Sequence, residues 1–212
     1  MIWLQLESSA QVLTEYGHEL GMPQQWEFIE MPSLDLSVSQ AVLERSFEST
    51  KAIIMIAPIS VLDRMIPVNQ PAYPDKDLIF IKQTIDNACG AIALFHVLLN
   101  TDSTSIISGI AELDTAAARG LAVENNQQLL AIHQKYCNEG STDVPDLDAD
   151  TDLHFIVFIA KGCSIYCMDG RRDTPLLVTL LDSDFASSTC KFLEEKLIDE
   201  TDNRIALLAL IE

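Results

Sequence analysis

The chain has 212 residues, 48% of them hydrophobic, and its 13 basic and 32 acidic residues give a formal net charge of −19. This acidity argues against nucleic acid or an anionic membrane as a partner, because both are bound by Lys and Arg side chains that neutralise phosphates. No apolar run is long enough to span a bilayer, and the first residues lack the basic and apolar regions of a signal peptide. We therefore expect the five cysteines to be free thiols in a reducing compartment, the cytoplasm or also the nucleus.

The first part of the chain predicts two helices and three strands. Ser8 or Ser9 can cap the first helix, and Gly21 can end it. An apolar run at 52–59 is typical of a buried strand that ends near its proline, and three prolines make 67–77 a loop. Helices are expected to end near residue 20 and to cover about 38–47, and strands to cover 26–30, 52–59 and 78–82.

The second part begins with a helix over 89–99 that is apolar on nearly every side, which is typical of the middle of a domain. Two helices, about 109–119 and 123–136, are expected to follow with a break near Gly120. Residues 138–152 hold five aspartates, one glutamate and no basic residue, and predict a mobile acidic loop. Strands are then expected over 154–160, 163–168, 176–181 and 204–211, with a helix over 185–198. This order predicts an α+β fold with a mainly antiparallel sheet.

One short motif predicts chemistry. Gln83 lies six residues before Cys89, and Cys89 opens the apolar helix. The glutamine amide and the cysteine N–H could both point at a developing oxyanion. A helix N-terminus also favours a thiolate over a thiol. The motif therefore predicts a thiol hydrolase, which also needs a histidine and an orienting carboxylate.

The chain offers four histidines for that role: His18, His96, His133 and His154. His18 lies near the end of the first helix, where a cation suits the helix dipole, and we expect it to be structural. His96 is two helical turns from Cys89, about 10 Å away, which is too far for proton transfer. His133 has no distinguishing context. His154 starts a strand directly after the acidic loop, and we expect it to be the catalytic base.

The carboxylate follows from the predicted hairpin that His154 begins. A two-residue turn at Lys161–Gly162 would place His154 opposite Asp169, with Cβ atoms roughly 5 Å apart. Asp169 could then accept from the imidazole and fix its tautomer. A register slip of one residue would put the two side chains on opposite faces, so the inference depends on the turn. The alternative is an ordinary hairpin with a surface histidine.

No metal or cofactor is expected. Asp146, Asp148 and Asp150 resemble the start of an EF-hand loop, but the required glycine and final glutamate are missing. Cys163 and Cys167 are expected on one face of a strand, where core packing explains them better than zinc, because no second ligand pair accompanies them.

Glutamine, cysteine, histidine and aspartate in this order resemble the ubiquitin C-terminal hydrolase (UCH) family of cysteine proteases. The 15-residue separation of His154 and Asp169 is also that of the family. The resemblance covers essentially the whole chain. It is carried by Lys82–Gly90, Leu153–Ile156 and Met168–Arg171, and supported by Trp3–Glu7, Leu20–Gly21, Trp26 and Glu139–Pro145.

The resemblance implies one catalytic domain over 1–212, with a papain-like fold and a knotted backbone. It implies that Cys89 is the nucleophile, Gln83 the oxyanion-hole glutamine, His154 the general base and Asp169 its orienting carboxylate. The acidic loop 138–152 would cross over the active site and restrict leaving groups to small or flexible ones. The implied partner is ubiquitin, whose basic tail suits an acidic enzyme, and a monomer is expected.

Two features depart from the family pattern, and two alternatives stay open. The segment between Cys89 and the acidic loop is short, and Asn203–Ala206 stands where the family tends to have Arg-Phe-Asn-Ala. Another modifier with a glycine-ended tail, such as NEDD8, would fit the same chemistry. A ubiquitin-binding adaptor without activity is the alternative of another class, although all four predicted catalytic side chains are present.

Overall fold

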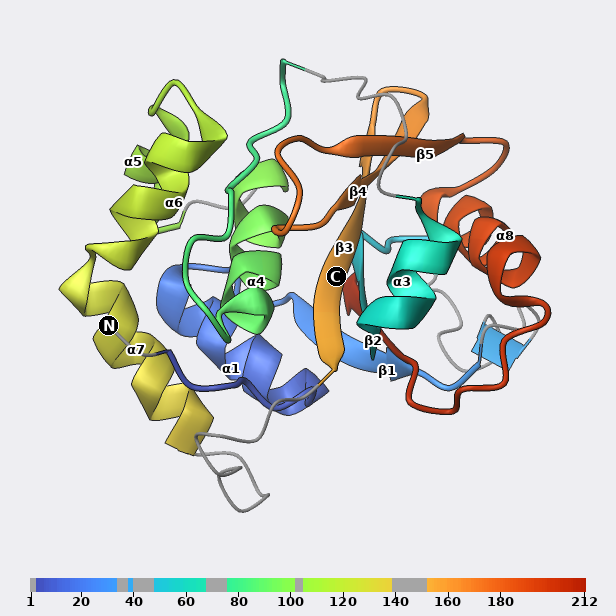
Figure 1. The fold of residues 1–212 in the computed structure, drawn as a ribbon, viewed down its shortest axis with the longest axis horizontal. Coiled ribbons are helices and arrows are strands. Elements are labelled where there is room, and N and C mark those ends of the chain that lie inside the picture. The colour runs from blue at the N-terminus through green and yellow to red at the C-terminus, as the bar shows by residue number, and fades with distance from the viewer. Residues whose placement is uncertain (1–2, 34–37, 40–47, 68–75, 102–104, 139–151) are drawn as a thin grey trace.

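A six-stranded antiparallel sheet forms the centre of the computed structural model, which describes residues 3–33, 38–39, 48–67, 76–101, 105–138 and 152–212 (Figure 1). The strand order is β1-β6-β2-β3-β4-β5. The strands are β1 (Glu27–Met31), β2 (Ala52–Pro58), β3 (Leu153–Lys161), β4 (Ser164–Met168), β5 (Leu176–Leu180) and β6 (Ala206–Ile211). The helices are α1 (Ala10–Leu20), α3 (Ile59–Met65), α4 (Cys89–Asn100), α5 (Ser108–Ala111), α6 (Ala116–Glu124), α7 (Gln127–Asn138) and α8 (Phe185–Leu197). The predicted α+β architecture with an antiparallel sheet is confirmed.

Helices cover both faces of this sheet. In Figure 1, α1 and α4 to α7 lie on one side of the strands, and α3 and α8 lie on the other. Along β2, Ile54 and Ile56 belong to the core on the α1–α4 side, whereas Ile53 and Met55 belong to the core on the α3–α8 side. A strand that is buried on both faces needs apolar residues at every position, which explains why β2 reads as a continuous apolar run.

The helix α4 runs through the larger core. Every residue from Gly90 to Leu98 is buried, as its all-round apolar sequence predicts. The first helix also forms as predicted, with Ser9 accepting from the Val12 N–H and Gly21 in the left-handed conformation at φ 104°.

The helical region after α4 divides differently from the prediction. Its described residues, 105–138, form three helices, and Gly120 lies inside α6 instead of at a break. The side chain of Thr115 accepts from the Ala118 N–H at the start of α6, and Asn126 accepts from the Gln128 N–H at the start of α7. Polar caps therefore set these boundaries, and Gly120 is used for close packing that is described below.

The strand predicted over 78–82 is wrong. This segment has no regular secondary structure, because side chains take the place of a neighbouring strand. The Asn100 amide accepts from the Ile79 N–H and donates to the Ile79 carbonyl, both at 2.8 Å. The Ile81 N–H lies 3.0 Å from His96 Nε2, so the polar side chains of α4 bind this extended chain.

The β3–β4 hairpin forms, but the predicted register is wrong. Lys161 pairs with Ser164, so the two-residue turn is Gly162–Cys163, and Gly162 supplies the positive φ of 57° at its first position. His154 is therefore two residues away from the position opposite Asp169. A shift of two residues keeps both side chains on the same face, which preserves the predicted pair.

This turn also corrects the prediction for two cysteines. Cys163 is exposed in the turn, whereas Cys167 is buried on β4, so they do not pack together on one strand face. The predicted helix at 38–47 and the acidic loop at 138–152 lie mostly outside the described residues. The knotted backbone stays a prediction. Within the described ranges, no helix has the length and apolar character needed to cross a membrane.

Candidate active site

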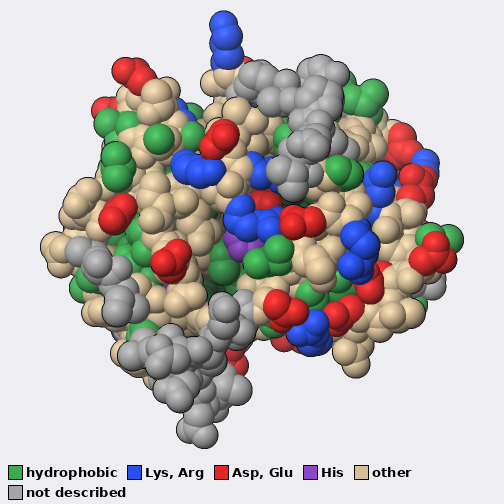
Figure 2. Space-filling view, viewed as in Figure 1, with side chains coloured by type: hydrophobic (Ala, Val, Ile, Leu, Met, Phe, Trp, Pro, Cys, Tyr) green, Lys and Arg blue, Asp and Glu red, His purple; other side chains and the backbone are tan. Residues whose placement is uncertain are grey.

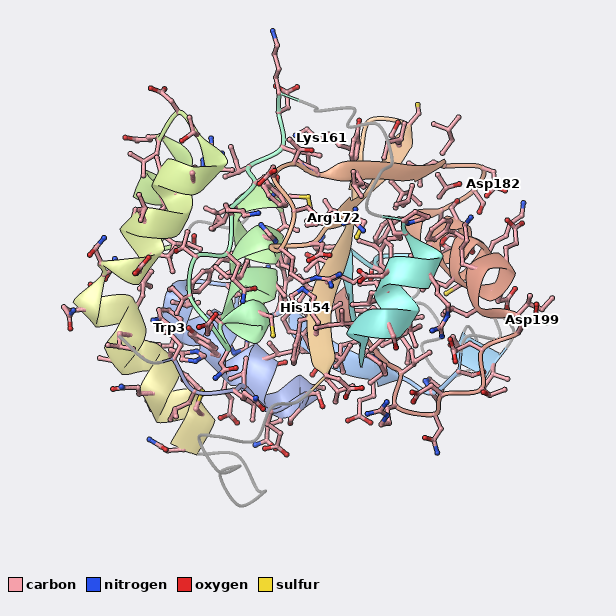
Figure 3. All side chains as sticks on the ribbon, in the orientation of Figure 1. Trp3, His154, Lys161, Arg172, Asp182 and Asp199 are labelled. Atoms are coloured by element: carbon pink, nitrogen blue, oxygen red, sulfur yellow. The ribbon has the colours of Figure 1, made fainter. Side chains whose placement is uncertain are left out.

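The four predicted site residues come from four places in the fold. Cys89 is the first residue of α4, His154 is the second residue of β3, and Asp169 directly follows β4. Gln83 lies in the extended segment that leads into α4. Figure 3 shows His154 next to the N-terminal end of α4, in the middle of the molecule, and Figure 2 shows a histidine side chain at the centre of the same face.

His154 and Asp169 form a buried pair. The His154 Nε2 atom lies 2.8 Å from Asp169 Oδ1, and the two residues are only 4% and 2% exposed. Because Nε2 is engaged by the carboxylate, Nδ1 is the ring nitrogen that remains for Cys89. Burial alone would lower the His154 pKa, but the hydrogen bonds and charges of Asp169 and Cys89 raise it above its ordinary value. The arrangement therefore favours an imidazolium at position 154.

The Asp169 carboxylate is held in place by several donors besides the histidine. Arg171 donates to Asp169 from its backbone N–H at 3.0 Å and from Nη2 at 2.7 Å, and Arg172 Nε lies 3.4 Å from Oδ2. Burial would raise the Asp169 pKa, yet the bonds from His154 and Arg171 keep it well below its usual range. Asp169 is therefore charged at all physiological pH values.

Cys89 lies at the positive end of α4 and is hydrogen-bonded to His154. Burial would raise the pKa of this thiol, but His154 and the backbone N–H groups of Phe155 and Gly90 lower it below the ordinary value. The N-terminus of α4 has no side-chain cap, in contrast to α1, α6 and α8, and it has no acidic residue in its first turn. Its N–H groups and its dipole are therefore available to a thiolate.

Gln83 is held in one orientation beside this pair. Its backbone N–H donates to the Gly170 carbonyl at 2.9 Å, and its side-chain Nε2 donates to the Ile85 carbonyl at 3.0 Å. An amide nitrogen carries two protons, so one N–H remains for a ligand. The Gln83 Oε1 atom is buried without a partner among the described residues, which fits a side chain that is oriented for its nitrogen.

A small cleft opens at Cys89. Its volume is about 90 Å³, and it is lined by Gln5, Leu6, Ser8, Ile56, Asn87, Cys89, Leu153 and Phe155. One wall therefore comes from the N-terminal segment and another from β2 and β3. The cleft is narrow, which suits an extended chain of small residues better than a bulky ligand.

Comparison with known proteins identifies the family. The family model "Ubiquitin carboxyl-terminal hydrolase, family 1" matches residues 3–198, a range that contains all four site residues. The chain belongs to this family. The UCH family is a family of cysteine peptidases, and the resemblance seen in the sequence is thus confirmed.

Relatives of this UCH chain include ubiquitin carboxyl-terminal hydrolases of several organisms. It is 28% identical to a ubiquitin carboxyl-terminal hydrolase of Aplysia californica over 186 residues, covering 82% of this chain and 85% of the relative. It is 30% identical to one from Drosophila melanogaster over 192 residues, covering 83% and 82%. The fold is similar to the crystal structure of the Trichinella spiralis UCH37 catalytic domain bound to ubiquitin vinyl methyl ester, with a TM-score of 0.80, 24% identity and coverage of 100% and 96%.

The other three histidines of this UCH chain have structural surroundings. His96 and His133 are fully buried, and burial lowers both pKa values to about 4. His96 stacks on Phe80, and His133 Nε2 bonds the Leu4 carbonyl at 2.8 Å. His18 bonds the Trp26 carbonyl, also at 2.8 Å. The neutral, buried imidazoles of His96 and His133 support the choice of His154 as the base.

Two residues of the site were missed from the sequence. Arg171 holds Asp169, and the available signal was its place in the Met168–Arg171 motif, two residues after the aspartate. Asn87 has a φ of 62° and turns the chain into α4 beside the cleft. An Asp-Asn pair before a helix is a recognisable signal, because Asn tolerates the left-handed conformation better than most residues.

Proposed function

We propose that this chain is a deubiquitinating thiol protease that hydrolyses small or flexible adducts from the C-terminal glycine of ubiquitin. The observation that carries the proposal is the buried His154–Asp169 pair, joined at 2.8 Å and hydrogen-bonded through His154 to Cys89. Membership of the UCH family supplies the reaction class. A related fold bound to ubiquitin vinyl methyl ester supports ubiquitin as the partner.

The proposed mechanism is acyl transfer through Cys89. The thiolate attacks the carbonyl carbon of the terminal glycine, and the carbonyl π electrons move onto oxygen. The Cys89 N–H and the remaining Gln83 N–H stabilise this oxyanion, for which one donor is typically worth roughly 3–4 kcal/mol. His154 protonates the departing amine as the C–N bond breaks, and then takes a proton from the water that hydrolyses the thioester. Asp169 keeps the imidazole oriented and stabilises its charged form.

We also propose that residues 138–152 form the acidic loop that crosses over this site. Its flanking residues support the assignment, because Asn138 ends α7 and Asp152 directly precedes β3, on which His154 lies. Asp152 is anchored by Arg204 at 2.7 Å and through its carbonyl by the Ile59 N–H at 2.8 Å. A chain that connects Asn138 to Asp152, two residues before His154, and crosses over Cys89 would limit the width of the leaving group.

Labelling with ubiquitin vinyl methyl ester tests the proposed function. The wild-type chain should form a covalent adduct, and Cys89→Ser should abolish it. Cys137→Ser is the matched control, because Cys137 Sγ also lies near a histidine, 3.3 Å from His133 Nε2, while burial raises its pKa to about 12. This variant should label normally. Failure of the wild type to label would refute the enzyme assignment, and the same assay with NEDD8 distinguishes the two modifiers.

A further inference from the structure

The segment 78–84 carries Gln83 without forming a strand, so its position depends on its neighbours. On one side, α4 holds Ile79 and Ile81 through Asn100 and His96, as described above. On another side it meets α6, and the two elements are joined near Gln83 itself. The placement of the predicted oxyanion donor is therefore determined by α4, which begins at Cys89, and by α6, which carries none of the four predicted catalytic residues.

The helix α6 contacts both residues that flank Gln83. The Lys82 N–H donates to the Ala116 carbonyl at 3.0 Å, and Thr84 Oγ1 donates to Glu124 Oε2, also at 3.0 Å. Gln83 thus lies between two contacts with one rigid helix. Such contacts on both sides restrict the rotation as well as the translation of the residue between them.

Gly120 is the point of closest approach between α6 and this segment. A Cβ atom at Gly120 would lie 2.1 Å from the Lys82 carbonyl oxygen and 3.0 Å from Thr84 Cγ2, whereas an ordinary contact begins at 3.4 Å. The oxygen is a backbone atom, so it cannot rotate away from an added methyl group. Glycine is otherwise unfavourable inside a helix, which indicates that this packing is the reason for its presence.

We propose that α6 positions Gln83 for the oxyanion and that Gly120 is the positioning residue. The Lys82 carbonyl and the Gln83 nitrogen belong to one planar peptide unit, so any displacement of the oxygen moves Gln83 directly. That nitrogen donates to the Gly170 carbonyl at 2.9 Å, which transmits the displacement to the hydrogen bond that holds Gln83 beside Asp169. The inference rests on the proposed function, in which Gln83 stabilises the oxyanion.

Gly120→Ala tests this inference with ubiquitin carrying a C-terminal fluorogenic group as substrate. The substitution must separate the helix and the segment by about 1 Å, and a misplacement of that size can cost about a hundredfold in rate. We expect kcat to fall at least tenfold while KM stays within about twofold, because ubiquitin binding is unaffected. Gly109→Ala in α5 is the matched control, since its Cβ would meet nothing within 4 Å, and its kcat should equal that of wild type.

Two further readouts separate positioning from general damage. The variant Gly120→Ala/Gln83→Ala should have the same kcat as Gln83→Ala alone, because the defect acts through Gln83. Alkylation of Cys89 by iodoacetamide needs a thiolate but no oxyanion donor, so its rate should be unchanged in Gly120→Ala. Three results would each overturn the inference. The first is a kcat in the double variant that is lower than in Gln83→Ala alone, the second is slower alkylation of Cys89 in Gly120→Ala, and the third is a wild-type kcat in Gly120→Ala.

The outcomes also separate this inference from the proposed function. If Gln83→Ala keeps the wild-type kcat, the oxyanion role of Gln83 fails and the positioning role fails with it. If Gln83→Ala is impaired and Gly120→Ala is not, only the positioning role fails. Should Gly120→Ala not fold, Arg119→Ala replaces it in the same kinetic and alkylation experiments, alone and combined with Gln83→Ala, and is judged by the same outcomes. Arg119 lies on the same helix, and its Nη1 donates to the Phe80 carbonyl at 3.0 Å.

Discussion

Replacing Asp169 with asparagine removes a negative charge that lies 2.8 Å from His154 Nε2 while keeping the size of the side chain. The loss should destabilise the charged imidazolium relative to the neutral ring, because a hydrogen bond to a charged group contributes roughly 1.5–3 kcal/mol. The positive charges of Arg171 and Arg172 remain beside the ring, and they disfavour its charged form further. We therefore expect the His154 pKa to fall and the Cys89 thiolate to become less stable.

The magnitude follows from the exchange of an ionic for a neutral acceptor. A loss of about 2 kcal/mol corresponds to a shift of about 1.5 pKa units, since one unit is 1.36 kcal/mol. The pKa of the Cys89 thiol should rise by that amount in Asp169→Asn. Where the thiol form dominates, a rise of one unit in the Cys89 pKa lowers the thiolate fraction tenfold. The alkylation rate should therefore fall by about thirtyfold at neutral pH and recover at high pH.

The assay is the pH dependence of Cys89 alkylation by iodoacetamide, followed by mass spectrometry. Asp63→Asn is the matched control, because Asp63 binds the same Arg171 at 3.1 Å but lies on α3 with its side chain 42% exposed. Its profile should stay close to that of wild type. Two results would refute the reasoning: an unchanged midpoint in Asp169→Asn, or an equal shift in both variants.

Two further predictions concern stability. Burial lowers the His133 pKa to about 4, whereas a histidine in the unfolded chain titrates near 6.5, so the unfolded state binds the additional proton between these pH values. From pH 7 to pH 5 the wild type should therefore lose about 2 kcal/mol of unfolding free energy relative to His133→Gln, as measured by urea denaturation. Unfolding free energies of the two proteins that change in parallel with pH would contradict this. Gly90→Ala places a Cβ 2.9 Å from Leu6 Cβ, and we expect it to lower the free energy of unfolding by about 1–3 kcal/mol in the same urea experiment. An unfolding free energy equal to that of wild type would contradict this, because it would show that the N-terminal segment moves aside without cost.

The pairing of His154 with Asp169 shows which features of a β-hairpin can be predicted from a sequence. The face that a side chain occupies depends only on whether the register is odd or even, so the pair survived an error of two residues in the turn. The register itself depends on which residues form the turn. Both Lys161–Gly162 and Gly162–Cys163 contain the glycine that a tight turn needs, so the sequence could not decide between them.

The error at 78–82 has a different physical cause. An apolar run of four residues followed by a lysine has the composition of a strand, and nothing within the segment reveals that its hydrogen bonds are made with side chains. His96 lies on the helix predicted over 89–99, and Asn100 extends that helix by one residue. The partners of their polar atoms can be assigned only after the tertiary fold is known. Gly120 illustrates the same limit, because a glycine required for close packing looks like one that ends a helix.

The position of β6 between β1 and β2 has a consequence for how the chain folds. Both neighbours lie in the first 58 residues, whereas β6 begins at Ala206, so the centre of the sheet is closed by contacts between segments that are far apart in sequence. Such non-local pairing is slow, because the loop entropy must be overcome before the contacts form. While the intervening residues are being synthesised, β1 and β2 lack the strand that joins them, and their unpaired edges are open to association with other chains. We therefore expect β1 to join the sheet only after residue 211 has left the ribosome, because β6 connects β1 to β2.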